Sequence, residues 1–443
     1  MCSAKTNGNA TEAAIGELLR FTKANSPYYA HAWRDIDDDH LSLSNIPVVD
    51  HASFWESNTC RNSTVLTSQQ KDGIIFKTGG TTAHPKVSFY SHAELASVSK
   101  QLAEGLARSG VQAGDLVANL FYAGDLYGSF LLHILSVYHL PSGAGAVQLP
   151  IAGHVGLESM EGHLVEFEAG VVLATVTTMC KLAERALGAG KTHPYVRLLL
   201  FSGEAFYADQ AGLLRAAFPN AAVRSLIYGS MDCGVIGLPP PPSLSDGTNN
   251  DPRLHQVNNP AIVVEILDDD GEKGGKPITT PGVAGRLVVT NLERRLMPIV
   301  RYPSGDRAAW VDHSRALFRI LDRDRTAIRL GPVSIDFVDL RRVVAAALEG
   351  ETLGALQAVV SREDRKDKLT LAVAHTPASE EQGAALRRAI RAGLDASRPM
   401  FREHVDRGLV AGLGVKFVRA GELAANPRSG KAVEVVDVRG TSV

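Results

Sequence analysis

The sequence predicts an α/β protein with a large N-terminal domain of doubly wound mixed sheets plus a β section, and a small α+β C-terminal domain. Between residues 70 and 230, short apolar runs alternate with amphipathic helical stretches, which is typical of a mostly parallel sheet covered by helices. After Gly237 the pattern changes to a proline-rich loop followed by strands and turns. A charged connector at 321–325 marks a second change, so we place the domains at 1–322 and 323–443.

The first strands surround a loop rich in glycine and threonine. Apolar runs at 73–76 and 87–90 predict a strand on each side of this loop. A helix then opens at Ser91, where Glu94 completes a capping box, and Gly110 ends it.

Further strands and helices follow at the same spacing. Strands are predicted at 170–176, 197–201 and 224–228, and helices at 181–187 and 211–218. The β section contains strand-like runs within 263–278 and 285–291. The C-terminal domain is predicted to contain helices at 336–348 and 379–397 and strands at 355–360 and 368–376.

Charge and composition exclude several classes of protein. The 443 residues include 46 basic and 48 acidic ones, a net charge of −2, which argues against bulk nucleic-acid binding or a polybasic membrane surface. The 4 cysteines form no CxxC pair, so neither a zinc site nor a disulfide framework is indicated. The most apolar run, 169–180, is too short to cross a membrane, and the polar N-terminus lacks a signal core. We therefore expect a cytoplasmic protein.

The loop at 77–86 is the sharpest local feature. Adjacent glycines let backbone N–H groups converge, threonines add hydroxyl donors and Lys86 adds positive charge, a combination that binds phosphate oxygens. Its spacing is not that of a Walker loop. A decorated hairpin turn is the alternative.

Three later motifs are each weak alone. Asp232, after the apolar run that ends at Tyr228, could hold Mg²⁺ or form an ordinary Asx turn. Asp306, after a glycine turn, could accept two ribose hydroxyls or lie in a surface turn. Lys431, between two strand-like runs, taken alone is a solvated lysine.

Together, in this order, the motifs resemble the adenylate-forming superfamily of acyl-CoA synthetases and adenylation domains, and within it the phenylacetate–CoA ligase branch. The similar stretches include SPYYAHAW, NLFYAGDLYGS, LLLFSGEAF, GRLVVTNLERRLMPIVRYPSGD and NPRSGKAVEVVDVR, and the resemblance spans about 26–439.

The resemblance implies a role for each matching position. Lys431 would bridge the attacking carboxylate and the α-phosphate, and Asp232 would bind Mg²⁺ in place of the usual glutamate. Tyr228 would flank the adenine, and Asp306 would bind the ribose. The implied nucleotide-binding residues are Thr78, Gly79, Gly80, Thr81, Thr82, Lys86, Gly203, Glu204, Tyr228, Gly229, Ser230, Asp306 and Arg323, and the implied acyl pocket contains Phe121, Tyr122 and Tyr127.

The implied activity is a ligase that uses ATP and Mg²⁺ to convert an aromatic carboxylic acid into an acyl-adenylate, with CoA as the default acceptor. A carrier protein, a small amine or a hydroxyl remain alternative acceptors, and a homodimer is left open. A non-catalytic nucleotide-binding homologue is the rival, favoured by departures at Ala83, His84 and Met231. The resemblance also implies that the small domain is mobile and alternates between two poses.

Overall fold

The computed structural model describes the chain apart from residues 1, 78–85, 142–144, 242–250, 269–274, 324–326, 349–352, 354, 420–421, 425–432 and 440–443. The side chains of residues 2–9, 208, 209, 322, 323 and 327 also lie outside the description.

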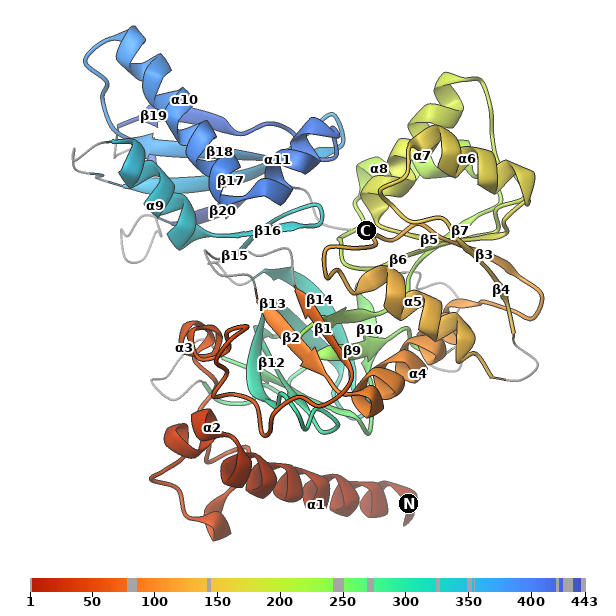
Figure 1. Ribbon diagram of the computed structural model, residues 1–443, viewed down its shortest axis with the longest axis vertical. Coiled ribbons are helices and arrows are strands. Elements are labelled where there is room, and N and C mark those ends of the chain that lie inside the picture. Colours follow the sequence, from red (N-terminus) through yellow and green to blue (C-terminus); the bar gives the residue numbers. More distant parts are fainter. Residues whose placement is uncertain are drawn as a thin grey trace.

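A parallel sheet forms the centre of one half of the molecule, in agreement with the predicted doubly wound arrangement (Figure 1). Its described strands run in the order β4-β3-β5-β6-β7, and all of their pairings are parallel. This is the flavodoxin-like order, in which the order of strands across the sheet reverses beside the first strand, β3. The strands are β3 (Leu116–Asn119), β4 (Val147–Pro150), β5 (Val171–Ala174), β6 (Leu198–Phe201) and β7 (Ala222–Ser225).

Helices cover both faces of this sheet because its strands bury side chains on both sides. Val172 packs among α6 (Leu157–Glu166), α7 (Val176–Gly188) and α8 (Ala208–Ala217), whereas its neighbour Val171 packs with α4 (His92–Ser109) and α5 (Ser129–Tyr138). The capping box predicted for α4 is present: Ser91 Oγ accepts from the Glu94 N–H, and the Glu94 carboxylate accepts from the Ser91 N–H at 2.9 Å. Gly110 ends the helix in the left-handed region at φ 102°.

An antiparallel sheet forms the predicted β section, with strands in the order β11-β12-β13-β14-β10-β9-β8 among the described residues. They are β8 (Tyr228–Ser230), β9 (Gly234–Leu238), β10 (Leu254–Val257), β11 (Ile262–Leu267), β12 (Ala284–Asn291), β13 (Ile299–Asp312) and β14 (Leu317–Arg323).

Two predicted elements differ from the structure. The run 224–228 is not one strand, because β7 ends at Ser225 and Tyr228 begins β8 in the other sheet. Helix α7 begins at Val176, well before the predicted 181, because Thr175 caps it by accepting from the Thr178 N–H.

The N-terminal helices α1 (Cys2–Asn25), α2 (Pro27–Ala32) and α3 (His51–Glu56) pack against the antiparallel sheet, and the short η1 (Asp38–His40) between α2 and α3 has no buried residue. Leu18, Trp33 and Phe54 share one buried core with Val289 and Ile299 of that sheet. The hairpin β1 (Ile74–Lys77) and β2 (Val87–Tyr90) flanks the glycine-rich loop as predicted.

A small C-terminal section follows the predicted boundary at 322–323, which lies at the end of β14. Its sheet has the order β19-β18-β17-β20, next to the hairpin of β15 and β16. The elements are β15 (Ala327–Leu330), β16 (Val333–Asp336), α9 (Phe337–Ala347), β17 (Leu356–Glu363), β18 (Lys366–Ala374), α10 (Glu380–Ser397), α11 (Pro399–Asp406), β19 (Gly414–Val418) and β20 (Val435–Asp437).

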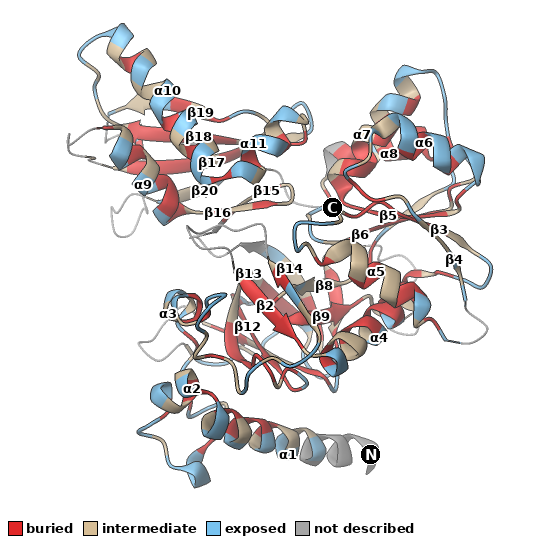
Figure 2. Cartoon of the chain, in the orientation of Figure 1, coloured by how far each residue is buried: buried red, intermediate tan, exposed pale blue. Residues whose placement is uncertain are grey.

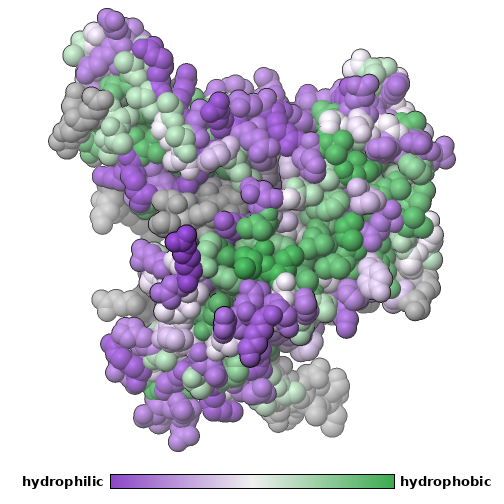
Figure 3. All heavy atoms as spheres, in the orientation of Figure 1, coloured by the Kyte–Doolittle hydropathy of each residue, from purple (hydrophilic) through white to green (hydrophobic). Residues whose placement is uncertain are grey.

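The buried residues gather in the sheets and on the inner faces of the helices (Figure 2). On the face drawn in Figure 3, hydrophobic residues are concentrated over α5, whereas the small C-terminal section is mostly hydrophilic. No helix in the described part of the chain combines the length and the apolar character that a membrane crossing requires.

Candidate active site

A cleft of about 1020 Å³ lies where the parallel sheet, the antiparallel sheet and the small C-terminal section meet. Its walls come from the start of α3, the β1–β2 hairpin, the loop after β6, the turn after β8, the middle of β13 and the β15–β16 hairpin. The cleft therefore lies beside the carboxyl ends of the parallel strands, where open α/β sheets place ligands. The predicted residues that line it are Lys86, Tyr127, Gly203, Glu204, Tyr228, Gly229, Ser230, Asp232 and Asp306.

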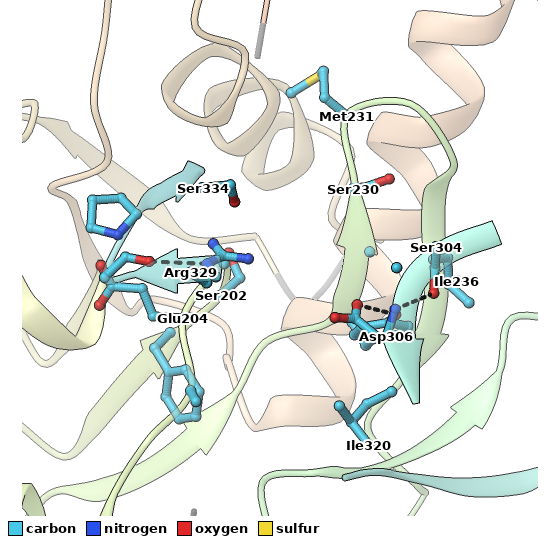
Figure 4. Close-up of a pocket in the computed structure, with 18 of the residues that line it drawn as sticks. Ser202, Glu204, Ser230, Met231, Ile236, Ser304, Asp306, Ile320, Arg329 and Ser334 are labelled. Carbon is cyan, nitrogen blue, oxygen red and sulfur yellow. Dashed lines mark hydrogen bonds between the residues drawn. The ribbon is translucent and has the colours of Figure 1, made fainter. Parts of the chain in front are cut away.

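Tyr228 and Asp306 lie in direct contact. The Tyr228 hydroxyl donates to Asp306 Oδ2 at 2.6 Å, and the Asp306 N–H donates to Ser304 Oγ at 3.2 Å. Figure 4 shows Asp306 and Ser304 together on one wall of the cleft, near Ser230. A carboxylate fixed beside an aromatic ring in this way can accept hydrogen bonds from the hydroxyl groups of a ligand whose ring lies against the tyrosine.

Asp232 is buried behind this wall. Its Oδ1 accepts from Ser88 Oγ at 2.8 Å, and the Tyr302 hydroxyl is also hydrogen-bonded to it. Burial raises the pKa of the Asp232 carboxyl, while nearby Lys86 and these hydroxyls oppose the shift. Mg²⁺ is usually held by one or two carboxylates together with substrate phosphates, so this single carboxylate fits such an ion.

Lys86 lies at the end of the glycine-rich loop, near enough to Asp232 for its charge to act on that carboxyl. Its ammonium donates to His51 Nε2 at 2.8 Å and lies 5.3 Å from the centre of the Trp55 ring. Burial and the charge of Lys86 lower the pKa of His51 to about 3, so the imidazole is neutral. The Trp55 indole N–H donates in turn to the Tyr302 hydroxyl at 2.9 Å.

Glu204 lies on the other wall, next to Arg329 (Figure 4), and the preceding Gly203 also lines the cleft. Gly203 has φ 80°, and a Cβ there would come within 3.5 Å of the Arg329 guanidinium. Glu204 Oε2 accepts from the Thr177 N–H and hydroxyl, both at 2.8 Å. Burial raises the pKa of Glu204, and Thr177 and Arg329 oppose the shift.

The three aromatic residues of the predicted acyl pocket lie in different places. Tyr127 lines the cleft, whereas Phe121 packs against the His133 ring in the core, with ring centres 4.3 Å apart. Tyr122 lies under the small C-terminal section, with its ring centre 5.7 Å from that of His404. The pocket role of all three stays a prediction.

The small section docks on the parallel-sheet half through Arg407. Its Nη2 donates to the Gly153 carbonyl at 2.9 Å, and its guanidinium lies 5.1 Å from the centre of the Tyr122 ring. The Arg407 carbonyl accepts from Lys181 Nζ. A nearby ion pair joins Arg365 to Glu184 at 2.9 Å.

Several predicted residues cannot be placed. Lys431 and the loop residues Thr78, Gly79, Gly80, Thr81 and Thr82 lie outside the described residues. The backbone of Arg323 pairs with Asp306 across β13 and β14, but its side chain is not described.

His51, Tyr302 and Arg329 were not identified from the sequence. Tyr302 lies inside the RYPSGD motif and could have been included from it. His51 gave no signal, because only the packing of α3 on the antiparallel sheet brings it to Lys86.

No protein-family model matches the chain. Phenylacetate–coenzyme A ligase from Thermus thermophilus is 25% identical over 384 residues, which cover 82% of this chain and 80% of that protein. Among solved structures, 2-hydroxyisobutyryl-CoA ligase in complex with 2-HIB-AMP and CoA in the thioesterification state is 20% identical, with a TM-score of 0.74 over 99% of this chain and 91% of that one. The same ligase in the postadenylation state with 2-HIB-AMP is 20% identical, with a TM-score of 0.61 over 98% and 90% of the two chains.

Proposed function

We propose that the substrate of this chain is an aromatic carboxylic acid. The premise is that the chain belongs to the adenylate-forming superfamily and is an AMP-forming acid–CoA ligase of the phenylacetate–CoA ligase type. In the first step a carboxylate oxygen attacks the α-phosphorus of ATP, and pyrophosphate leaves. In the second step the CoA sulfur attacks the acyl carbonyl, AMP leaves, and the thiol proton passes to solvent.

The observation that carries the ATP-dependent step of the proposal is that one cleft has an end suited to adenosine and an end suited to phosphates, while the aromatic acid is inferred from the similarity to phenylacetate–coenzyme A ligase. Tyr228 and Asp306 are suited to the adenosine, and Lys86 and Asp232 are suited to the phosphates. A polyphosphate chain needs positive charge along its length, whereas a ribose needs a fixed acceptor. The cleft offers both, and Ser230 and Gly229 lie between them.

Mg²⁺ would be held by Asp232 together with the phosphates of ATP, and when bound it neutralises charge on the leaving pyrophosphate. Ser88 and Tyr302 keep the carboxylate in place by hydrogen bonding to it. The glycine-rich loop and Lys431, which lie outside the described residues, keep the phosphate-binding and carboxylate-bridging roles that the resemblance implies.

The small C-terminal section is proposed to stand in its thioester-forming pose. The support is the higher TM-score against the thioesterification structure, 0.74, than against the postadenylation structure of the same ligase, 0.61. In this pose Arg329 and Gly331 border the cleft beside Glu204. Such a docked pose would exclude water while the thiol attacks.

The test is acid-dependent exchange between ATP and pyrophosphate in the presence of Mg²⁺, across benzoates, phenylacetates, hydroxybenzoates, aminobenzoates and aliphatic acids. Exchange with one aromatic group, followed by thioester formation with CoA, supports the proposal. Exchange only with aliphatic acids would overturn the aromatic assignment. ATP binding without exchange for any acid would favour a non-catalytic homologue. Acyl transfer to an amine or a carrier protein in place of CoA would overturn the assignment of CoA as the acceptor.

A further inference from the structure

The N-terminal segment delivers a histidine to the phosphate end of the cleft. His51 is the first residue of α3, and Asp50 caps that helix by accepting from the Ser53 N–H at 2.8 Å. The Val49 N–H donates to the Arg301 carbonyl at 3.0 Å, which fastens the segment to β13. The backbone on each side of His51 is therefore held by a hydrogen bond.

The ring is also held by its aromatic neighbours. Its centre lies 6.3 Å from the centre of the Trp55 ring and 5.7 Å from that of Tyr302. Trp55 and Tyr302 are both buried and are hydrogen-bonded to each other. These two ring contacts favour the orientation in which Nε2 faces Lys86.

That orientation aims Nε2 at Lys86. A lysine ammonium can only donate, so Nε2 accepts in the 2.8 Å contact and the ring proton is on Nδ1. A lysine side chain has a long flexible stem, and holding its ammonium in one place costs conformational entropy. His51 Nε2, on a helix with a fixed start, and the face of Trp55 hold the Lys86 ammonium before any ligand binds. Less conformational entropy of Lys86 is then lost on ligand binding.

We propose that His51 is a positioning residue for the β- and γ-phosphates of ATP, acting through Lys86, whose ammonium it holds beside Asp232. This inference rests on the proposed function, since it takes the nucleotide as the ligand of the cleft. His51 is not proposed to contact the reacting atoms. Its role is to keep the Lys86 charge at the phosphate end.

The chain offers a matched pair of variants. In His51→Gln the amide oxygen can reach the position of Nε2 and accept from Lys86, whereas in His51→Asn the shorter amide reaches only the position of Nδ1. We expect His51→Asn and His51→Ala to weaken ATP binding on the order of tenfold or more, the range of a hydrogen bond to a charged group. His51→Gln should restore most of the affinity.

Binding is measured by calorimetry with ATP and, separately, with AMP, which lacks the β- and γ-phosphates. The expected result is a loss for ATP and little change for AMP. A double-mutant cycle with Lys86→Ala tests the route: if His51 acts through Lys86, adding His51→Ala to Lys86→Ala has almost no further effect. Thermal unfolding of each variant is recorded beside the binding data.

Equal losses for ATP and AMP, additive effects in the cycle, or a His51→Gln variant no better than His51→Asn would each overturn the inference. If His51→Ala does not fold, the comparison of the Gln and Asn variants still decides it. Failure of the wild-type chain to bind ATP would instead overturn the proposed function, so the two failures are distinguishable.

Discussion

Arg407 gives a direct test of the thioester-forming pose, because it joins the small C-terminal section to the rest of the chain without lining the cleft. In Arg407→Ala the hydrogen bond to the Gly153 carbonyl and the contact with the Tyr122 ring are both lost. The Arg407 carbonyl remains available to Lys181, since it belongs to the backbone.

The magnitude follows from these two contacts. A hydrogen bond from a charged donor contributes about 1.5–3 kcal/mol, and an exposed cation–π contact contributes about 0.5–1 kcal/mol. The Arg407 side chain is 30% exposed, so we take the low end of each range, about 2 kcal/mol in total. The docked pose is then disfavoured by roughly 30-fold.

The assay separates the two half-reactions. We expect Arg407→Ala to slow thioester formation from supplied acyl-adenylate and CoA by about 10- to 30-fold, and to leave acid-dependent pyrophosphate exchange close to the wild-type rate. Arg402→Ala is the control, because Arg402 lies on α11, which Arg407 caps at its C-terminal end, is 66% exposed and pairs with Asp406 of that helix at 3.7 Å. Equal slowing of both half-reactions in Arg407→Ala, or no slowing of thioester formation, would refute the reasoning.

Four further predictions concern the site and the stability of the fold. Asp306→Asn removes the charge of the proposed ribose acceptor, so KM for ATP in the exchange assay should rise about 10- to 100-fold; an unchanged KM would contradict the ribose role. Lys431→Ala should abolish exchange but spare thioester formation from supplied acyl-adenylate, and the reverse pattern would show that its role is misassigned. Burial lowers the pKa of His133 to about 3, so from pH 6.5 downward the unfolded chain binds a proton that the folded chain does not. The free energy of unfolding therefore falls as the pH falls. Denaturant titrations should find that His133→Gln removes about 2 kcal/mol of the loss between pH 7 and 5, whereas an unchanged slope would mean that His133 does not contribute to it. Gly73 has φ 98°, and a Cβ there would come 1.9 Å from the Tyr90 carbonyl oxygen; Gly73→Ala should therefore lower the free energy of unfolding by at least about 1–3 kcal/mol, and a smaller loss would show that the hairpin adapts.

The sequence predicted the fold well where local signals repeat. Alternating apolar runs and helical stretches identified the parallel sheet and its helices, and the capping box at Ser91 and Glu94 is present in the structure. The error at 224–228 has a physical cause. Residues 225–228 are all partly or fully buried, so hydrophobicity could not indicate that the chain leaves one sheet at Ser225 and enters another at Tyr228.

The candidate site was predictable to the extent that its residues follow strands within recognisable motifs. Nine predicted residues line one cleft, although they come from segments far apart in the chain. Their chemical roles remain predictions, because position in a cleft does not by itself show what a side chain binds. His51 and Arg407 could not be predicted, since each depends on a contact between segments that are distant in sequence.

The proposed phosphate end of the cleft also gives a reason why a residue as remote in sequence as His51 would matter. Asp232 is buried, and burial alone would favour its neutral form, which is a poor ligand for a metal ion. The charge of Lys86 opposes that shift only while the ammonium stays close, because the interaction weakens with distance. His51 and Trp55 are two contacts that help to keep it close, and Trp55 is joined through Tyr302 to Asp232 itself. The lysine and the aspartate are therefore supported by one aromatic cluster, and loosening either side of it should affect both.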